Sequence, residues 1–91
     1  MGGMAKADIH FTPDESILKA VSKVIREERK KQGLTQEGLA TRSSLHWRHI
    51  QRFETGQLNP SLCSFIRLAS GLEINAGDLI DRVLSEAKRV K

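Results

Sequence analysis

The sequence predicts an all-α protein built from five short helices. Glycine and proline interrupt the 91 residues at regular intervals, and between these interruptions apolar residues recur at helical spacing. No stretch alternates apolar and polar residues as a half-buried strand would. A chain of this length buries only about 60–65% of the surface that its unfolded form exposes, which limits it to one compact core.

The first helix is expected to follow a mobile N-terminal arm, residues 1–11, which shows no helical pattern. Thr12 can cap this helix, Pro13 suits its first position, and Glu15 can complete a capping box. Gly33 is expected to end it. The apolar residues predicted on its buried face are Ile17, Val21, Val24 and Ile25.

The second helix is expected to begin at Thr35, which can cap it. Its interior contains Gly38, which costs roughly 1 kcal/mol relative to alanine, so the helix depends on packing. A tight connection over 43–45 leads to a third helix over about 46–54, which Gly56 closes. The residues expected to face the core from these helices and their connection are Leu39, Ala40, Leu45, Ile50 and Phe53.

The fourth helix is expected to start at 59–61 (Asn-Pro-Ser) and to end at Gly71. The apolar residues at helical spacing along it are Leu62, Phe65, Ile66 and Ala69. Asn75 is expected to cap the fifth helix, which takes up residues 75–91, whereas residues 12–74 form the core of the domain.

The fifth helix carries a broader apolar face than one side of so small a core covers. We expect part of this face to form a two-fold homodimer interface. The alternative is that all of it packs against the first and fourth helices. The residues predicted for the interface are Leu79, Ile80, Val83, Leu84 and Ala87, with Val90 continuing the apolar face.

The positive charge of the chain is concentrated in one internal segment. The net charge is +4, but residues 1–18 sum to −2, residues 19–52 to +6 and residues 53–91 to zero. A basic segment suggests an anionic partner, although a solvated helix face would look the same. The sequence contains no long apolar run and no secretory leader, so neither a membrane span nor secretion is expected. The single cysteine, Cys63, fits a reducing cytoplasm.

The second and third predicted helices are too closely connected to run antiparallel with full overlap. They must cross steeply, which is the helix-turn-helix geometry that presents its second helix to a DNA major groove. Arginine can bind guanine there, glutamine can bind adenine, and an exposed indole can meet a thymine methyl group. No acidic residue lies between Glu37 and Glu54. The residues predicted to read bases are Trp47, Arg48, His49, Gln51 and Arg52.

The sequence resembles the Cro/C1-type (XRE) helix-turn-helix repressors over about residues 17–80. The matching residues are Arg29-Lys30-Lys31-Gln32-Gly33-Leu34-Thr35-Gln36-Glu37, Leu39-Ala40, Leu45, Ile50, Arg52, Glu54, Gly56 and Asn59-Pro60-Ser61-Leu62. The resemblance implies a five-helix, lambda-repressor-like DNA-binding domain and a transcriptional regulator.

Individual residue roles follow from the same resemblance. Gln36 would bind a phosphate and brace the recognition helix, and Gln57 and Asn59 would also lie at phosphates. Arg29 and Glu54 would form a structural salt bridge.

Three residues depart from the family pattern. Ser44 occupies a turn position that is usually glycine, at a cost of about 1 kcal/mol for a left-handed conformation. His46 stands where a small capping residue is usual, which leaves the capping of the third helix open. Trp47 is larger than the family's usual residues, and it could pack onto its own domain instead of facing DNA.

No feature of the sequence favours catalysis, a cofactor or a small-molecule ligand. There is no phosphate loop, nucleophile elbow or metal-ligand spacing. His46 and His49 lie three residues apart, but without a nearby cysteine or carboxylate we expect DNA or solvent contacts rather than a metal site. Cys63 is expected to be a small core or interface residue.

The sequence therefore predicts a homodimeric, sequence-specific regulator that binds double-stranded DNA at a pseudo-palindromic operator, as a repressor or autoregulator. The alternative is a protein-interaction module, such as an antitoxin or coactivator, that uses the same helices to bind another protein. Restriction–modification controllers, prophage repressors and antitoxins all have this size, and the sequence does not choose among them.

Overall fold

The computed structural model describes residues 14–89. These residues form five helices and no strand, which confirms the predicted all-α class. The expected N-terminal arm, the cap at Thr12 and Pro13, and the apolar Val90 lie outside the described residues. The helices are α1 (Asp14–Lys31), α2 (Gln36–Ser43), α3 (Trp47–Glu54), α4 (Leu62–Gly71) and α5 (Ala76–Arg89).

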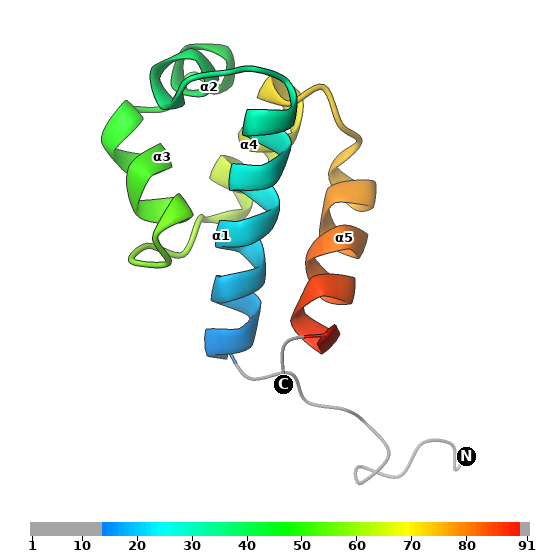
Figure 1. The fold of residues 1–91 in the computed structure, drawn as a ribbon. Coiled ribbons are helices and arrows are strands. Elements are labelled where there is room, and N and C mark those ends of the chain that lie inside the picture. The colour runs from blue at the N-terminus through cyan, green and yellow to red at the C-terminus, as the bar shows by residue number, and fades with distance from the viewer. Residues whose placement is uncertain (1–13, 90–91) are drawn as a thin grey trace, which may run out of the picture.

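The long helix α1 stands at the centre of the arrangement (Figure 1). It packs against α5 on one side and α3 on the other, while α2 packs against both α3 and α4. Within residues 14–89, no helix is long and apolar enough to cross a bilayer.

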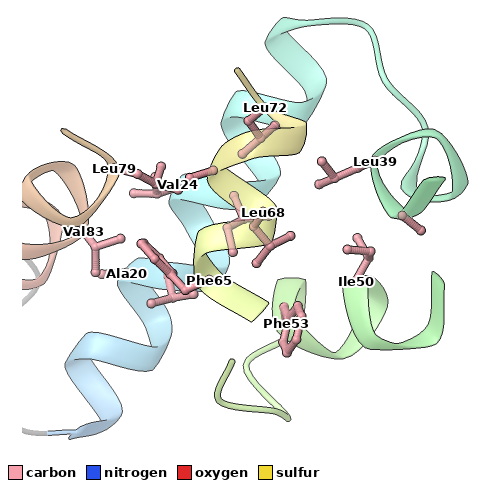
Figure 2. Packing of buried hydrophobic residues seen from close by; sticks show 14 of the residues in the cluster. Ala20, Val24, Leu39, Ile50, Phe53, Phe65, Leu68, Leu72, Leu79 and Val83 are labelled. Carbon is pink, nitrogen blue, oxygen red and sulfur yellow. The ribbon is translucent and has the colours of Figure 1, made fainter. Parts of the chain in front are cut away.

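One hydrophobic core joins all five helices (Figure 2). Burial of these apolar side chains is the main favourable contribution to folding. The largest fully buried side chains are Ile25, Leu39, Ile50, Leu68, Leu72 and Leu79.

Side-chain caps at Thr35, Ser61 and Asn75 fix where α2, α4 and α5 begin. Thr35 Oγ1 accepts a hydrogen bond from the Gly38 N–H at 2.9 Å, as the sequence predicts. Asn75 Oδ1 accepts hydrogen bonds from the backbone N–H groups of Gly77 (2.8 Å) and Asp78 (3.2 Å), again as predicted. Ser61 caps α4 at the end of the predicted Asn-Pro-Ser start. Each cap satisfies backbone donors that have no partner inside the helix.

The apolar face predicted for α4 is wrong in part. Leu62 and Ile66 are 69% and 50% exposed, because α4 buries the adjacent face that carries Phe65, Leu68 and Ala69. Cys63 is also exposed, so it is not a core residue.

α4 ends at Gly71, as the sequence predicts, and Leu72 is the C-cap. Gly71 itself does not have a left-handed conformation. The left-handed residue is Glu73, with φ of 58°. Gly71 instead meets a packing requirement, because it is buried against Ser43 of α2.

The structure divides the apolar face of α5 into two sets. Leu79, Val83 and Ala87 are buried in the chain's own core, which corrects their assignment to a dimer interface. Their spacing of four residues places them on one face of the helix, and α5 packs against α1. Ile80 and Leu84 are the apolar residues of the predicted set that remain exposed.

Candidate nucleic-acid interface

The turn between α2 and α3 is closed by a serine in a left-handed conformation. Ser44 has φ of 55° and ψ of 41°, and its N–H donates to the Thr41 carbonyl at 3.3 Å. The Leu45 N–H donates to the Ala40 carbonyl at 3.0 Å. The turn has the form that glycine usually supports in a helix C-cap, although serine occupies the position. The two hydrogen bonds hold the turn in place.

His46 is the N-cap of α3, which answers a question that the sequence left open. Its backbone is extended (φ −74°, ψ 139°), and its Nδ1 accepts a hydrogen bond from the Arg48 N–H at 3.1 Å. The imidazole therefore provides the hydrogen-bond acceptor that a small hydroxyl or amide side chain usually provides at an N-cap. An acceptor Nδ1 in a neutral imidazole places the ring proton on Nε2.

The face of α3 that points away from the core is polar and cationic. Ile50, Phe53 and Glu54 are buried. Neither Arg48 nor Arg52 forms an ion pair within residues 14–89, so both guanidinium groups are available to an anion. The exposed residues of the helix are Trp47, Arg48, His49, Gln51 and Arg52.

Four of these five residues line one open hollow on the surface, together with two residues that follow the helix. Gln57, predicted at the phosphates, is one of the two. Thr55 is the other, and the sequence reasoning missed it. Its position four residues after Gln51 could have been found by extending the helical spacing of α3 past Glu54. The lining residues are Trp47, Arg48, Gln51, Arg52, Thr55 and Gln57.

The remaining predicted contact residues lie elsewhere. His49 is exposed but does not line the hollow, and its ring lies 6.1 Å from that of His46 and 6.2 Å from that of Phe53. Asn59 is exposed in the segment between α3 and α4 and also lies outside the hollow. Gln36 is half-buried at the start of α2, where its Nε2 donates to Glu54 Oε1 at 3.1 Å.

Arg29 and Glu54 form a two-point ion pair that ties α3 to α1. Arg29 Nε lies 2.6 Å from Glu54 Oε2, and Arg29 Nη2 donates to Glu54 Oε1 at 2.9 Å. The side chains are 10% and 3% exposed. The hydrogen bond to Glu54 raises the pKa of Arg29 above its ordinary value, against the opposing effect of burial. Such paired, charge-assisted hydrogen bonds fix geometry as well as charge.

Three further hydrogen bonds extend this connection around the ion pair. Arg29 Nη1 donates to the Leu34 carbonyl at 2.8 Å, just before α2. Arg26 Nη1 donates to the Glu54 carbonyl at 3.0 Å, and the Gln36 amide completes the set. The C-terminus of α3 and the start of α2 are therefore fastened to the same part of α1. The polar face of α3 is presented on a rigid support.

The described part of the chain contains no cluster of metal-ligating side chains. Among residues 14–89, no three His, Cys, Asp or Glu side chains are placed to hold a metal ion. His46 and His49 are instead occupied with the helix cap and with ring contacts.

The family model described as "Helix-turn-helix" matches residues 25–79, more than half of the chain. Solved structures of restriction–modification controller proteins are similar as well. Wild-type C.Esp1396I is 30% identical, with a TM-score of 0.74 over 80% of this chain and 95% of that one. C.AhdI from Aeromonas hydrophila is 37% identical, with a TM-score of 0.66 over 68% of this chain and 94% of that one.

A third structure shows the C.Esp1396I tetramer in complex with its natural 35 base-pair operator. That chain is 30% identical, with a TM-score of 0.73 over 79% of this chain and 95% of that one. No sequence among the curated proteins matches this chain. The helix-turn-helix model covers the segment that holds α2, α3 and their ion-paired support. The chain belongs to the Cro/C1-type (XRE) helix-turn-helix family of DNA-binding transcriptional regulators.

Proposed function

We propose that this protein is a cytoplasmic regulator that binds double-stranded operator DNA sequence-specifically as a homodimer, with α3 in the major groove. In this role it represses transcription of its target genes or regulates transcription of its own gene. The observation that carries the proposal is the exposed face of α3. Two arginines that form no ion pair within residues 14–89, a glutamine and a tryptophan line one hollow there. The operator complex of the similar C.Esp1396I supports it.

The contacts divide into two kinds. Phosphate contacts fix the position of the protein on the duplex, whereas contacts to base edges carry the sequence information. Gln57 lies beside the base-reading residues, and Gln36 and Asn59 flank them along the chain. The proposed phosphate contacts are Gln36, Gln57 and Asn59, and the proposed base contacts are Trp47, Arg48, His49, Gln51 and Arg52.

Self-association is proposed through the apolar residues left exposed on the two C-terminal helices. Ile80 and Leu84 lie one turn apart on α5, and Leu62 and Ile66 lie one turn apart on α4. Among the described residues, these four and Trp47 are the large hydrophobic side chains that remain exposed. A two-fold interface would place two recognition helices about 34 Å apart, over a pseudo-palindromic site.

The regulated genes are proposed from the comparisons. Of the three settings that fit a protein of this size, the similar structures favour a restriction–modification controller. An operator adjoining genes for a methyltransferase and an endonuclease would agree with this role.

The decisive experiment measures binding to the DNA upstream of the protein's own gene. Arg48→Ala and Arg52→Ala should each weaken specific binding in a mobility-shift assay, by about 5- to 150-fold for a lost base contact. The matched control is Lys88→Ala, which removes one exposed positive charge from α5, on the side of α1 away from α3. Wild-type affinity in both arginine variants, with their folding intact, would exclude α3 as the reading helix.

Salt dependence separates this function from a protein-interaction module. Binding to DNA releases counterions, so the log–log plot of affinity against salt should have a slope corresponding to about 4–8 phosphates per dimer. An apolar interface with another protein would change much less. A flat salt response would therefore favour the protein-interaction alternative.

The oligomeric state has a direct test. Ile80→Asp and Leu84→Asp place a charge on the exposed row of α5 and leave the buried row intact. Sedimentation should show a dimer for the wild type and a monomer for these variants, with unchanged circular dichroism. A wild-type monomer at the concentrations that bind operator would contradict the homodimer.

A further inference from the structure

Three consecutive residues at the start of α3, His46, Trp47 and Arg48, contact one another. The guanidinium carbon of Arg48 lies over the Trp47 ring, 5.8 Å from its centroid. The His46 ring stacks with Trp47 at a centroid distance of 6.2 Å and an interplanar angle of 25°. His46 also accepts a hydrogen bond from the backbone of Arg48. Both the main chain and the side chain of Arg48 are therefore restrained.

Trp47 has no place in the core of its own domain. Its side chain is 40% exposed, it is not among the residues of the hydrophobic cluster, and it lines the hollow on α3. The ring contacts of this indole are with its two neighbours in the sequence, His46 and Arg48. The exposed indole therefore lies against a guanidinium group that forms no ion pair within residues 14–89.

We infer that Trp47 is a positioning residue for Arg48, and that the pair reads a guanine next to a thymine as one unit in each half-site. This inference rests on the proposed operator binding. A cation over an aromatic face is attracted by the ring's negative π surface, and the attraction strengthens when water is excluded. Arg48 therefore meets DNA with fewer conformations to lose than a free arginine would.

The geometry of guanine recognition favours this arrangement. The planar guanidinium fork binds the O6 and N7 acceptors of guanine in the major groove, and the fork and the base share a plane. The Trp47 ring, whose centroid lies 5.8 Å from the guanidinium carbon, would then be placed out of the guanine plane, toward the adjacent base pair. The apolar ring then meets the C5 methyl group that a thymine presents at that position.

The test uses modified bases in an operator that wild-type protein selects from random duplexes. Replacing guanine with 7-deazaguanine removes only the N7 acceptor, and replacing thymine with uracil removes only the C5 methyl group. For one guanine per half-site, 7-deazaguanine should weaken wild-type binding about 5- to 150-fold, the range for a base contact. The adjacent thymine should show a smaller loss with uracil.

The variants assign these effects to residues. Arg48→Ala should abolish the 7-deazaguanine effect. Trp47→Ala should reduce that effect several-fold although Arg48 is still present, and should abolish the uracil effect. Trp47→Phe keeps an aromatic face and should restore most of the guanine effect. Lys88→Ala serves as the charge control and should preserve both effects.

The outcomes distinguish this inference from the proposed function. Full sensitivity to 7-deazaguanine in Trp47→Ala, in protein that binds its operator, would overturn the positioning role of Trp47 and leave operator binding standing. Persistence of that sensitivity in Arg48→Ala would overturn the role of Arg48 as the guanine reader. A wild-type protein that selects no duplex would overturn both proposals. Since both side chains are exposed, circular dichroism should show all variants folded.

Discussion

Gly71 of α4 lies directly against Ser43 of α2, so closely that a Cβ atom at position 71 would collide with the Ser43 hydroxyl. The same Cβ would lie 3.2 Å from the backbone nitrogen of Ser43 and 3.3 Å from the Arg42 carbonyl carbon. The hydroxyl itself is buried, and among residues 14–89 it has no hydrogen-bond partner. α2 and α4 can therefore approach this closely only because glycine has no side chain at position 71. The contact leaves the Ser43 hydroxyl without a hydrogen bond within residues 14–89.

Gly71→Ala should destabilise the fold. The added methyl group overpacks the contact, at a cost of about 1–3 kcal/mol. The better helix propensity of alanine, worth about 1 kcal/mol, offsets only part of this cost. Urea denaturation measures the change, with Ser70→Ala as the control on the exposed neighbouring position. Equal stability of Gly71→Ala and wild type would show that the two helices can separate without loss.

Ser43→Ala should stabilise the protein by about 1–3 kcal/mol, because it removes a buried hydroxyl that has no hydrogen-bond partner in the described part of the chain. It should also recover part of the stability lost in Gly71→Ala, because the colliding oxygen is absent from the double variant. Thermal unfolding of the two single variants and the double variant measures this coupling. A lower melting temperature in Ser43→Ala would mean that the hydroxyl has a stabilising partner.

Glu54→Ala should be the most damaging single change near α3, at about 3–5 kcal/mol, because it leaves the Arg29 guanidinium buried and unpaired. Removing Arg29 as well should cost less than the sum of the two single changes. A double-mutant cycle in urea gives the interaction free energy directly. Strictly additive losses would show that the two side chains act independently.

Glu28 should make the stability sensitive to acid. The hydrogen bond from Gln32 lowers the pKa of Glu28 below its ordinary 4.5, burial opposes the change, and Arg82 lowers the pKa further. A carboxylate with a lower pKa in the folded state stabilises the fold above pH 4.5, and this contribution is lost as pH falls through the folded-state value.

The measurement is the free energy of unfolding between about pH 6 and pH 3 for wild type and Glu28→Gln. The glutamine variant should be less stable near neutrality and should lose less stability on acidification. Parallel curves for the two proteins would assign the acid sensitivity to other carboxylates.

The local features of the fold could be predicted from the sequence. Thr35 and Asn75 cap their helices as expected, since a cap needs only a side chain and the backbone two or three residues ahead. The sequence also predicts that α4 ends at Gly71, but it does not show why glycine is needed there. A glycine at a helix end usually takes the left-handed conformation, whereas Gly71 is required by the contact with Ser43, and Glu73 is the left-handed residue.

The division of apolar faces also required the tertiary structure. Periodicity places Leu62 and Ile66 on an apolar stripe, but it does not say which edge of the stripe another helix covers. The same limit applies to α5, where Val83 is buried and Leu84 is exposed. The outward side of α3 was easier to predict, because its narrow apolar face leaves the remaining positions to solvent.

Glu28 and Arg29 are neighbours on α1, yet they fasten opposite sides of the molecule. Arg29 holds Glu54 at the end of α3, whereas Glu28 accepts a hydrogen bond from Arg82 of α5 at 2.8 Å. Any rotation of α1 about its axis would disturb both connections, so α3 and α5 keep a fixed relation to each other. In the proposed homodimer, each protomer would then hold α3 at a set distance from the dimer interface. Adjustment to operators of unequal spacing has to come from the contact between copies or from bending of the DNA.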